Sequence, residues 1–263
     1  MPNDAVVDRY QVQSVARAME ILELVASSGE GGLSLTEISH GVGMAKSSTI
    51  AAARTLAKFG LLQIDLPGPR YRLGLALLRY GDLVAQQTSL GKSALPLLHH
   101  LTETTGLTAR LATNDDGYPV FVERVDGRGA VRFHTPLGQR EFPHATAAGK
   151  VILAHLAEAD ALRVIEESGL PRNSTNTITE RSDLLHELEM VRLMGFGVDN
   201  EEESEGIICV GAAVFDHAGV CVGAISLTGL KVDIPEGDVG RLGNLVRETA
   251  DRLTSILSGG RAS

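Results

Sequence analysis

The chain has 263 residues, of which 43% are hydrophobic and 22% are charged; this is the composition of an ordinary folded protein, and the length favours two cores. No apolar run approaches the ~20 residues that a membrane-spanning helix needs, and residues 1–10 do not read as a signal peptide. Cys209 and Cys221 are the only cysteines, too few for a disulfide framework. We therefore expect a cytoplasmic protein that does not enter a membrane.

The net charge of -9 is unevenly distributed along the chain. Residues 1–75 carry seven basic and seven acidic side chains, whereas residues 76–263 carry 17 basic and 26 acidic ones. A DNA-binding protein needs lysine and arginine to replace phosphate counterions. Five such residues lie within one stretch of 27 residues, which is therefore the candidate binding surface: Lys46, Arg54, Lys58, Arg70 and Arg72.

Two helices are predicted at the start of the chain. The first runs from Ser14 to about Ser27, and its apolar residues at three- and four-residue spacing predict one buried stripe of Val15, Met19, Leu22 and Ala26. The second is short and starts at a capping box, with Ser34 as the N-cap and Glu37 as its partner.

A third helix, from about Ala45 to Phe59, divides into two faces when its residues are placed roughly 100° apart. One face would pack on the other helices through Ala52, Ala53, Leu56 and Phe59. The opposite face would meet the major groove of DNA through Ser47, Ile50, Ala51, Arg54 and Lys58. A recognition helix needs this division, because one side must be anchored while the other reaches bases and phosphates. Periodicity alone leaves open an ordinary surface helix with two cations.

Two strand-like segments, 61–64 and 71–73, flank a turn forced by two prolines and a glycine. They predict a hairpin, and a hairpin after three helices makes a winged helix-turn-helix. Arg70 and Arg72 alternate outward around Tyr71, where they would contact phosphates or the minor groove. Plain solvated cations are the alternative.

The second part of the chain is predicted to follow a helix from Leu75 to about Gln87 that links the two parts. Strands and helices then mix without regular βαβ alternation, so the predicted fold class is α+β. Helices are expected at 92–105, 145–156, 158–168, 180–194 and 237–258. Strands are expected at 107–113, 119–126, 130–135, 207–215 and 220–228.

Eight motifs along the chain point to one known family. Four lie in the first part, at residues 13–18 (QSVARA), 35–38 (LTEI), 45–49 (AKSST) and 71–74 (YRLG). Four lie in the second, at residues 144–150 (HATAAGK), 195–202 (GFGVDNEE), 209–216 (CVGAAVFD) and 224–229 (AISLTG). Together they resemble the isocitrate lyase regulator (IclR) family of transcription regulators, in family order over about residues 12–257.

The resemblance implies a DNA-binding winged helix-turn-helix domain at 1–74 and a linker helix at 75–91. It implies that residues 92–263 form an effector-binding and oligomerisation domain with a profilin-like or GAF-like antiparallel sheet. The expected function is sequence-specific DNA binding, controlled by a small metabolite, a carboxylic or aromatic acid of a catabolic pathway. The expected partners are double-stranded operator DNA, the effector and a second copy of the chain, with the protein a dimer or a dimer of dimers. We expect no cofactor and no metal.

Carried over by motif, the DNA contacts come from Lys46, Ser47, Ser48, Ile50, Ala51, Arg54, Lys58, Arg70 and Arg72. The sequence departs from the family at Ala51, where members usually carry an arginine, and at Ala52 and Ala53, where they carry bulkier residues. Either Arg54 partly replaces the missing arginine, or this protein reads a different operator through short side chains.

The effector pocket implied by the resemblance comprises Thr146, Ala147, Ala148, Asp199, Ile207, Cys209, Ser226 and Thr228. The helix that opens near Thr146 offers free backbone N–H groups to an anion. Hydroxyls of Ser226 and Thr228 converge on one strand face. Asp199 would accept a hydrogen bond from a ligand hydroxyl or amine. An inert buried Cys209 and a structural Ser226 are the alternatives.

Some polar residues near the predicted pocket are not expected to bind the effector. Glu202, Glu203 and Glu205 are expected to form a solvated acidic turn. His144, a lone histidine before a helix, is expected to be structural as well.

Two other classes of function are alternatives to a regulator. An enzyme would need a set such as Glu201, Cys209 and His144, but no spacing rule joins these residues, and no nucleophile elbow, phosphate loop or HExxH motif is present. We therefore do not expect an enzyme. A ligand-binding or oligomerisation module without DNA binding would be favoured if the short side chain of Ala51 prevents the recognition helix from contacting bases.

Overall fold

A computed structural model describes residues 12–87, 89–129, 136–235 and 237–259 of the protein. The chain divides after Gln87 into two compact units. Each unit has an apolar core of its own, and the second has two. The strand expected at 130–135 lies outside the described residues.

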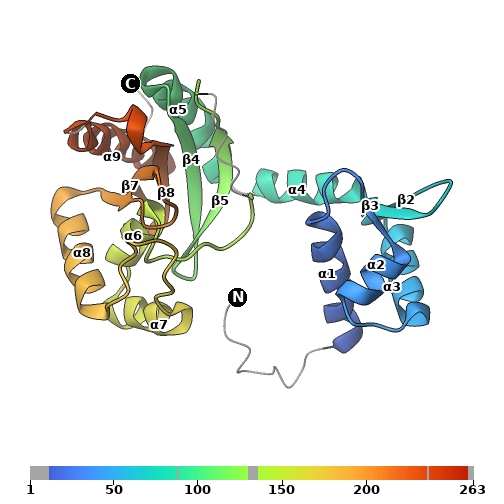
Figure 1. The fold of residues 1–263 in the computed structure, drawn as a ribbon. Coiled ribbons are helices and arrows are strands. Elements are labelled where there is room, and N and C mark those ends of the chain that lie inside the picture. Colours follow the sequence, from blue (N-terminus) through green and yellow to red (C-terminus); the bar gives the residue numbers. More distant parts are fainter. Residues whose placement is uncertain (1–11, 88, 130–135, 236, 260–263) are drawn as a thin grey trace. The chain divides into compact units, whose positions relative to one another are not determined.

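Three helices and a small antiparallel sheet form the first unit (Figure 1). The helices are α1 (Gln13–Ala26), α2 (Leu35–Gly41) and α3 (Lys46–Lys58). The sheet has the order β1-β3-β2 and consists of β1 (Leu33–Ser34), β2 (Leu62–Asp65) and β3 (Arg70–Leu73). The predicted winged helix-turn-helix is confirmed. The sequence does not predict β1, because two residues carry no periodic signal; it exists through the pairing of Leu33 with Tyr71.

The capping box that starts α2 is present as predicted. The Ser34 hydroxyl accepts a hydrogen bond from the Glu37 N–H at 3.3 Å, and the Glu37 carboxylate accepts one from the Ser34 N–H at 2.7 Å. These bonds to Ser34 lower the pKa of Glu37. Two N–H groups at the helix start thus gain partners, which fixes where α2 begins.

The buried face of α1 differs from the predicted one. Val15 and Met19 are 60% and 51% exposed, Ala26 is exposed, and Leu22 alone of the predicted stripe is buried. The core takes a neighbouring stripe instead, formed by Ala18, Ile21, Leu22 and Val25. Both stripes are apolar at helical spacing, so periodicity cannot choose between them, whereas packing on the rest of the unit can. An apolar surface on α1 is left exposed.

The predicted linker helix corresponds to α4 (Ala76–Gln87), and α5 (Ser89–Thr105) then opens the second unit. The helix expected at 92–105 therefore begins three residues earlier. Exposed apolar side chains lie at the start of α4 and along it, at Leu75, Leu78, Leu83 and Val84.

A five-stranded antiparallel sheet in the order β5-β4-β8-β7-β6 organises the second unit. Its strands are β4 (Thr108–Asp115), β5 (Tyr118–Val125), β6 (Gly197–Asn200), β7 (Ile207–Phe215) and β8 (Cys221–Leu230). Its further helices are α6 (Ala147–Ala154), α7 (Glu158–Ser168), α8 (Arg181–Met194), η1 (Lys231–Asp233) and α9 (Asp238–Leu257). The predicted α+β class is confirmed. The edge strand β6 is not predicted, because four residues that include Asp199 and Asn200 show no strand pattern.

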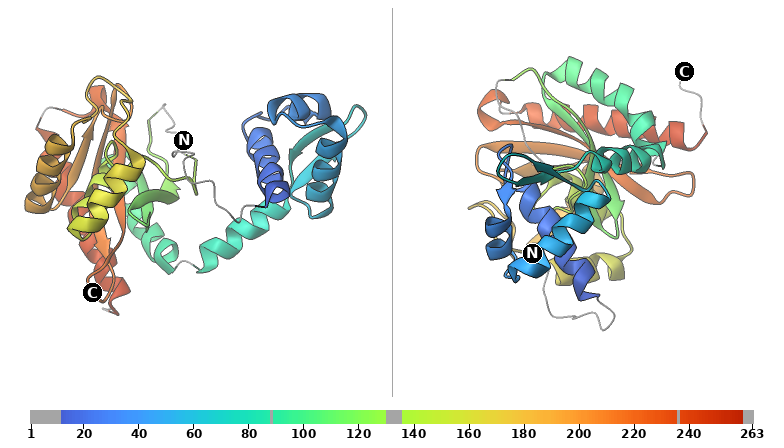
Figure 2. Two further views of the ribbon diagram at one scale, coloured as in Figure 1. Left: turned by 90° about the horizontal axis from the view of Figure 1, so that it is seen from below. Right: turned by 90° about the vertical axis from the view of Figure 1, so that its right-hand side faces the viewer.

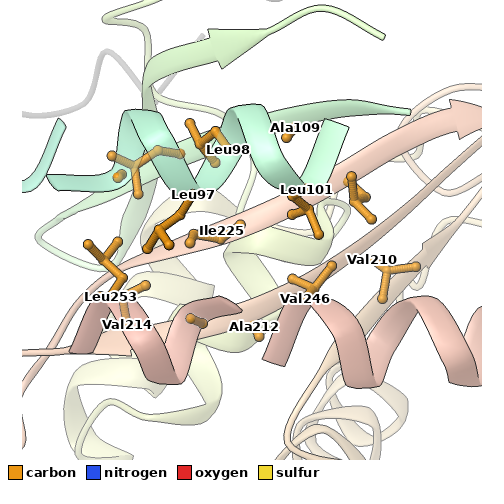
Figure 3. Packing of buried hydrophobic residues seen from close by; sticks show 14 of the residues in the cluster. Leu97, Leu98, Leu101, Ala109, Val210, Ala212, Val214, Ile225, Val246 and Leu253 are labelled. Atoms are coloured by element: carbon orange, nitrogen blue, oxygen red, sulfur yellow. The ribbon is translucent and has the colours of Figure 1, made fainter. Parts of the chain in front are cut away.

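Helices cover both faces of this sheet (Figure 1, Figure 2). Helices α5 and α9 pack on one face, where Leu98 and Leu253 belong to one core with strand residues such as Val210 and Ile225 (Figure 3). Helices α6, α7 and α8 pack on the other face. Because side chains alternate along a strand, Cys209 points away from the core that holds Val210. The polar strand residues that alternate with these core residues therefore lie on the face of the sheet that α6 covers.

Candidate functional site

The exposed face of α3 is the first candidate surface. Lys46, Ser47, Ser48, Ala51, Arg54 and Lys58 are exposed, and Ile50 is half-buried. The buried side of the helix consists of Thr49, Ala53 and Leu56. The side chains of Lys46, Arg54 and Lys58 form no ion pair or hydrogen bond with a described residue. The three cations are therefore available to a partner.

Phe59 does not anchor α3, contrary to the prediction. It is 62% exposed, and α3 ends one residue before it, at Lys58. Thr49 takes the anchoring place: it is fully buried, and its hydroxyl donates to the Ala45 carbonyl at 3.1 Å. On a helix, Phe59 lies about 80° around the axis from Thr49, at the edge of the buried stripe. Thr49 was not predicted to be buried because threonine is polar. Its hydroxyl can be buried because it forms a hydrogen bond to the preceding turn.

The hairpin arginines are tied to their own unit. Arg70 donates to the carbonyls of Gly31 and Gly32 at 2.8 and 3.0 Å. Arg72 forms an ion pair with Asp65 and donates to the Glu30 carbonyl. Both side chains remain about half exposed. They therefore have less freedom to reach a partner than the cations of α3.

A cavity of about 400 Å³ in the second unit is the second candidate site. Five of the eight predicted pocket residues line it: Thr146, Asp199, Ile207, Cys209 and Thr228. The sequence missed the other lining residues, Arg110, Pro136, Gln139, Arg140, Glu141, Phe142, Glu203 and Ser204. Five of these eight residues come from the segment before α6, and Arg110 comes from β4; neither segment carries a family motif.

Three predicted pocket residues, Ala147, Ala148 and Ser226, are not among the residues that line the cavity. Ala147 and Ala148 are each 1% exposed, because the start of α6 packs on the backbone of β7. A Cβ on Gly211 would meet the Ala147 carbonyl group at 3.2 Å, a tight contact that favours a glycine at this position. Ser226 pairs with Gly211 in the same layer and is 1% exposed, and its hydroxyl has no partner among the described residues. The lining thus includes Thr146, the N-cap of α6, but not the first two residues of the helix.

Arg110 places a positive charge in the cavity wall. It lies on β4 and is only 6% exposed. Its guanidinium stacks over the Phe121 ring at 4.1 Å from the centroid, and Nη2 donates to the Cys209 sulfur at 3.6 Å. These contacts fix the orientation of its planar donor fork.

Three carboxylates line the same cavity, and burial raises the pKa of each. The pKa of Glu141 rises to about 7, because burial outweighs the nearby Arg110 charge. The pKa of Asp199 and that of Glu203 are also raised by burial. Asp199 accepts hydrogen bonds from the N–H groups of Glu202 and Glu203 at 2.8 and 3.2 Å, so it also holds the following turn in place.

The acidic segment after β6 is not a solvated turn, which corrects the prediction for Glu202 and Glu203. Glu202 is 6% exposed and pairs with the fully buried Lys150 at 2.6 Å. Burial raises the pKa of Glu202, and the Lys150 ammonium opposes that rise. Glu203 accepts from Asn173 at 2.7 Å and lines the cavity. Only Glu205 is exposed as expected. The turn is buried because Lys150 and the chain between α7 and α8 reach it from elsewhere in the sequence.

Two family models match this chain. One, described as bacterial transcriptional regulator IclR C-terminal, matches residues 83–255. The other, described as IclR helix-turn-helix domain, matches residues 14–65. The chain belongs to the IclR family. The expected resemblance is thus confirmed over both units.

Relatives of this IclR-family protein match it over nearly its whole length. The HTH-type transcriptional regulator BhcR of Paracoccus denitrificans is 32% identical over 247 residues, covering 94% of this chain and 88% of BhcR. XynR of Escherichia coli, also an HTH-type transcriptional regulator, is 29% identical and covers 94% of this chain and 97% of XynR. The crystal structure of the Thermotoga maritima IclR has a TM-score of 0.80 at 28% identity, covering 94% of this chain and all of that one.

The IclR-family assignment makes the protein a transcription regulator and not an enzyme. The three residues considered for catalysis have structural surroundings. Burial raises the pKa of the Cys209 thiol to about 12, so it is not a thiolate near neutral pH. Glu201 pairs with Lys231, and His144 Nε2 contacts the Pro171 carbonyl at 3.0 Å, while burial lowers the His144 pKa. No helix in the described part of the chain has the length and apolar character needed to cross a membrane.

Proposed function

We propose that this IclR-family regulator binds its operator as a homodimer through the exposed face of α3, in the cytoplasm where the DNA lies. We propose further that a small molecule in the cavity of the second unit changes its operator affinity. Membership of the family supports the general function. The division of α3 into a buried side and a side with unpaired cations supports the role of its residues.

Base reading is assigned to the short and basic side chains of α3. Small residues such as Ser47 and Ala51 let the helix backbone approach the groove, and Ile50 suits a thymine methyl group. Arg54 lies three residues beyond Ala51 on the exposed side, where it can take over guanine recognition. Arg70 and Arg72 are proposed as phosphate contacts of smaller effect, because each already binds its own unit.

The DNA proposal is tested by fluorescence anisotropy with a duplex from upstream of the protein's gene and a scrambled duplex, at two salt concentrations. We expect affinity for both to fall steeply with salt. Arg54→Ala should weaken operator binding about 10- to 100-fold and scrambled binding much less. Arg252→Ala, which removes an exposed charge from α9, is the control and should change neither. Equal effects of the two variants, or no preference for the operator in the wild type, would refute the proposal.

Exposed apolar residues support the homodimer. Val15 and Met19 on α1 and Leu78 and Val84 on α4 are 51–72% exposed, although all are apolar. Exposed apolar surfaces of this kind are typical of interfaces. We assign them to a second copy of the chain, because regulators with paired recognition helices bind palindromic sites.

Light scattering coupled to size exclusion measures the oligomeric state. Leu78→Glu should shift the protein toward monomer, since it places a charge within the proposed interface. Leu193→Glu on α8 is matched in exposure, at 79% against 72%, and should leave the dimer intact. A monomeric wild type, or the same shift in both variants, would contradict the assignment. A mass of four chains would indicate the dimer of dimers.

The cavity supports the proposed effector control. A thermal-shift screen of short-chain and aromatic acids identifies ligands, which are then added to the operator titration. A true effector should change operator affinity about 5- to 150-fold, the usual range of coupling between two sites. Ligands that bind the cavity and leave operator affinity unchanged would show that the cavity has another use.

A further inference from the structure

The cavity wall combines one preorganised cation with an excess of negative charge. Among the lining residues the cations are Arg110 and Arg140. Arg140 is paired with Asp115 at 2.6 Å and stacks on Tyr118, so a carboxylate outside the cavity lining already opposes its charge. Arg110 is held over Phe121, with its fork in a fixed plane. A guanidinium in this setting suits a carboxylate, which it can bind through two parallel hydrogen bonds.

Glu141, Asp199 and Glu203 supply three negative charges to the same wall when ionised. They outnumber the two lining cations, of which Arg140 already pairs with Asp115. A ligand with only a carboxylate would add a fourth negative charge in a partly buried site, which raises the cost of binding. A ligand that carries a positive group as well brings no net charge and gives one of these carboxylates a partner.

Of the three lining carboxylates, Glu141 is the one whose side chain has no hydrogen bond to a described residue, although the Arg110 charge acts on it. Asp199 accepts two backbone N–H groups, and Glu203 accepts from Asn173. The Glu141 carboxylate accepts no hydrogen bond from a described residue, although its backbone N–H is held by the Pro119 carbonyl at 3.0 Å. A largely buried acceptor on a cavity wall is a site for a ligand donor.

We infer that the effector is a small amino acid-like molecule, whose carboxylate binds Arg110 and whose protonated amine binds Glu141. The inference deepens the proposed function and rests on the cavity being the effector site. Thr146 and Thr228 line the same cavity. The Thr146 hydroxyl caps α6 by accepting from the Gly149 N–H at 3.1 Å, so the Thr228 hydroxyl is the one better placed to bind a remaining polar atom of such a molecule.

Binding of such a ligand should depend on pH in a direction that identifies the amine. The charged groups acting on Glu141 are Arg110 from β4, Asp199 from β6 and Glu203 from the segment after it. The pKa of Glu141 is about 7 in the free protein. An ammonium group needs this carboxylate ionised, so its affinity should rise about tenfold from pH 6 to pH 8. A plain carboxylate should bind more weakly as Glu141 ionises.

The experiment measures calorimetric affinities for matched sets of three acids at pH 6 and pH 8. Each set holds an amino acid, the hydroxy acid and the unsubstituted acid of the same skeleton. The sets are alanine, lactate and propionate; aspartate, malate and succinate; and 4-(aminomethyl)benzoate, 4-(hydroxymethyl)benzoate and 4-methylbenzoate. We expect at least one set in which the amino member binds at least tenfold tighter than the other two at pH 8. Equal or tighter binding of a hydroxy or plain acid, or no binding in any set, would overturn the inference.

Two variants locate the amine and the carboxylate. Glu141→Gln should reduce the rise in affinity of the amino member between pH 6 and pH 8 from about tenfold to none. Glu205→Gln, the same change at an exposed position outside the cavity, should keep the rise. Arg110→Lys retains the charge but loses the fork, and should weaken all acids of the binding set alike. An unchanged pH dependence in Glu141→Gln would overturn the inference.

Operator binding separates this inference from the proposed function. If the protein binds its operator and responds to an acid without an amine, the inference fails and the proposed function stands. If the amino acid binds with the expected pH dependence and operator affinity does not change, the ligand class stands and the proposed control fails.

Discussion

The two units of this protein place their charges differently. In the first unit, Lys46, Arg54 and Lys58 lie on the outside of one helix, with no ion pair to a described residue. In the second unit, Arg110 and Lys150 are buried, and each meets groups from distant parts of the chain. The first arrangement suits a large partner that approaches from solvent, and the second suits a small ligand or a structural pair.

The difference also separates what local sequence controls from what packing controls. The exposed side of α3 follows from helical periodicity and a buried stripe of three residues. The surroundings of Lys150 require α6, α8 and β6 to come together, because its ammonium contacts Glu187, Glu202 and the Val198 carbonyl. No single segment contains that information.

The largest effect that tests this comparison is expected at Lys150. Lys150→Met leaves Glu202 buried without its cation, so the free energy of unfolding should fall by about 3–5 kcal/mol. Urea denaturation followed by circular dichroism measures it.

Lys92→Met, the same change at an exposed site on α5, should stay within about 0.5 kcal/mol of the wild type. Replacing both partners, in Lys150→Met with Glu202→Leu, should restore much of the loss, because no unpaired charge remains. If Lys150→Met behaved like Lys92→Met, the pair would contribute nothing and the contrast between the units would fail.

The fold could be predicted to a large extent from the sequence. Strong helical periodicity located α9 to within a residue or two, and the capping box located α2. The short strands β1 and β6 were not predicted, because they form by pairing with distant strands and their own residues show no strand pattern. The prediction of the buried face of α1 was wrong, because either of its two apolar stripes could pack in a core.

The candidate site divides in the same way. The α3 surface and residues within family motifs, such as Asp199 and Thr228, could be named from the sequence, and the structure places these two on the cavity wall. Arg110 and Glu141 could not, since nothing in their local sequence shows that two segments about 30 residues apart converge there. The acidic run at 201–203 was misleading, because burial depends on what covers it.

A second effect, of intermediate size, is expected at Glu141 and depends on pH. Its pKa rises from 4.5 to about 7 on folding, so the folded protein keeps a proton that the unfolded chain releases between these values. Stability should therefore fall as pH rises through this window. Glu141→Gln removes the cost and should be more stable than the wild type at pH 8, by roughly 1–2 kcal/mol after allowance for solvent screening. At pH 4 the two should be equal. Thermal and urea unfolding at both pH values check this, and a difference independent of pH would show that packing, not charge, is responsible.

The smallest effect is expected in the first unit, at the cap of α2. Ser34→Ala removes the acceptor for the Glu37 N–H, and should lower the free energy of unfolding by about 1 kcal/mol, measured by urea denaturation. Ser34→Thr keeps a hydroxyl and should retain most of the stability, whereas Ser48→Ala, at an exposed serine inside α3, should have little effect. The loss at Ser34 should be several times smaller than the loss at Lys150, because the backbone groups it exposes lie near solvent and water can replace the lost bond. An effect as large as that of Lys150→Met would mean that the first unit also depends on buried polar contacts. The two units would then differ in where their charges lie, but not in how much their polar contacts contribute to the free energy of unfolding.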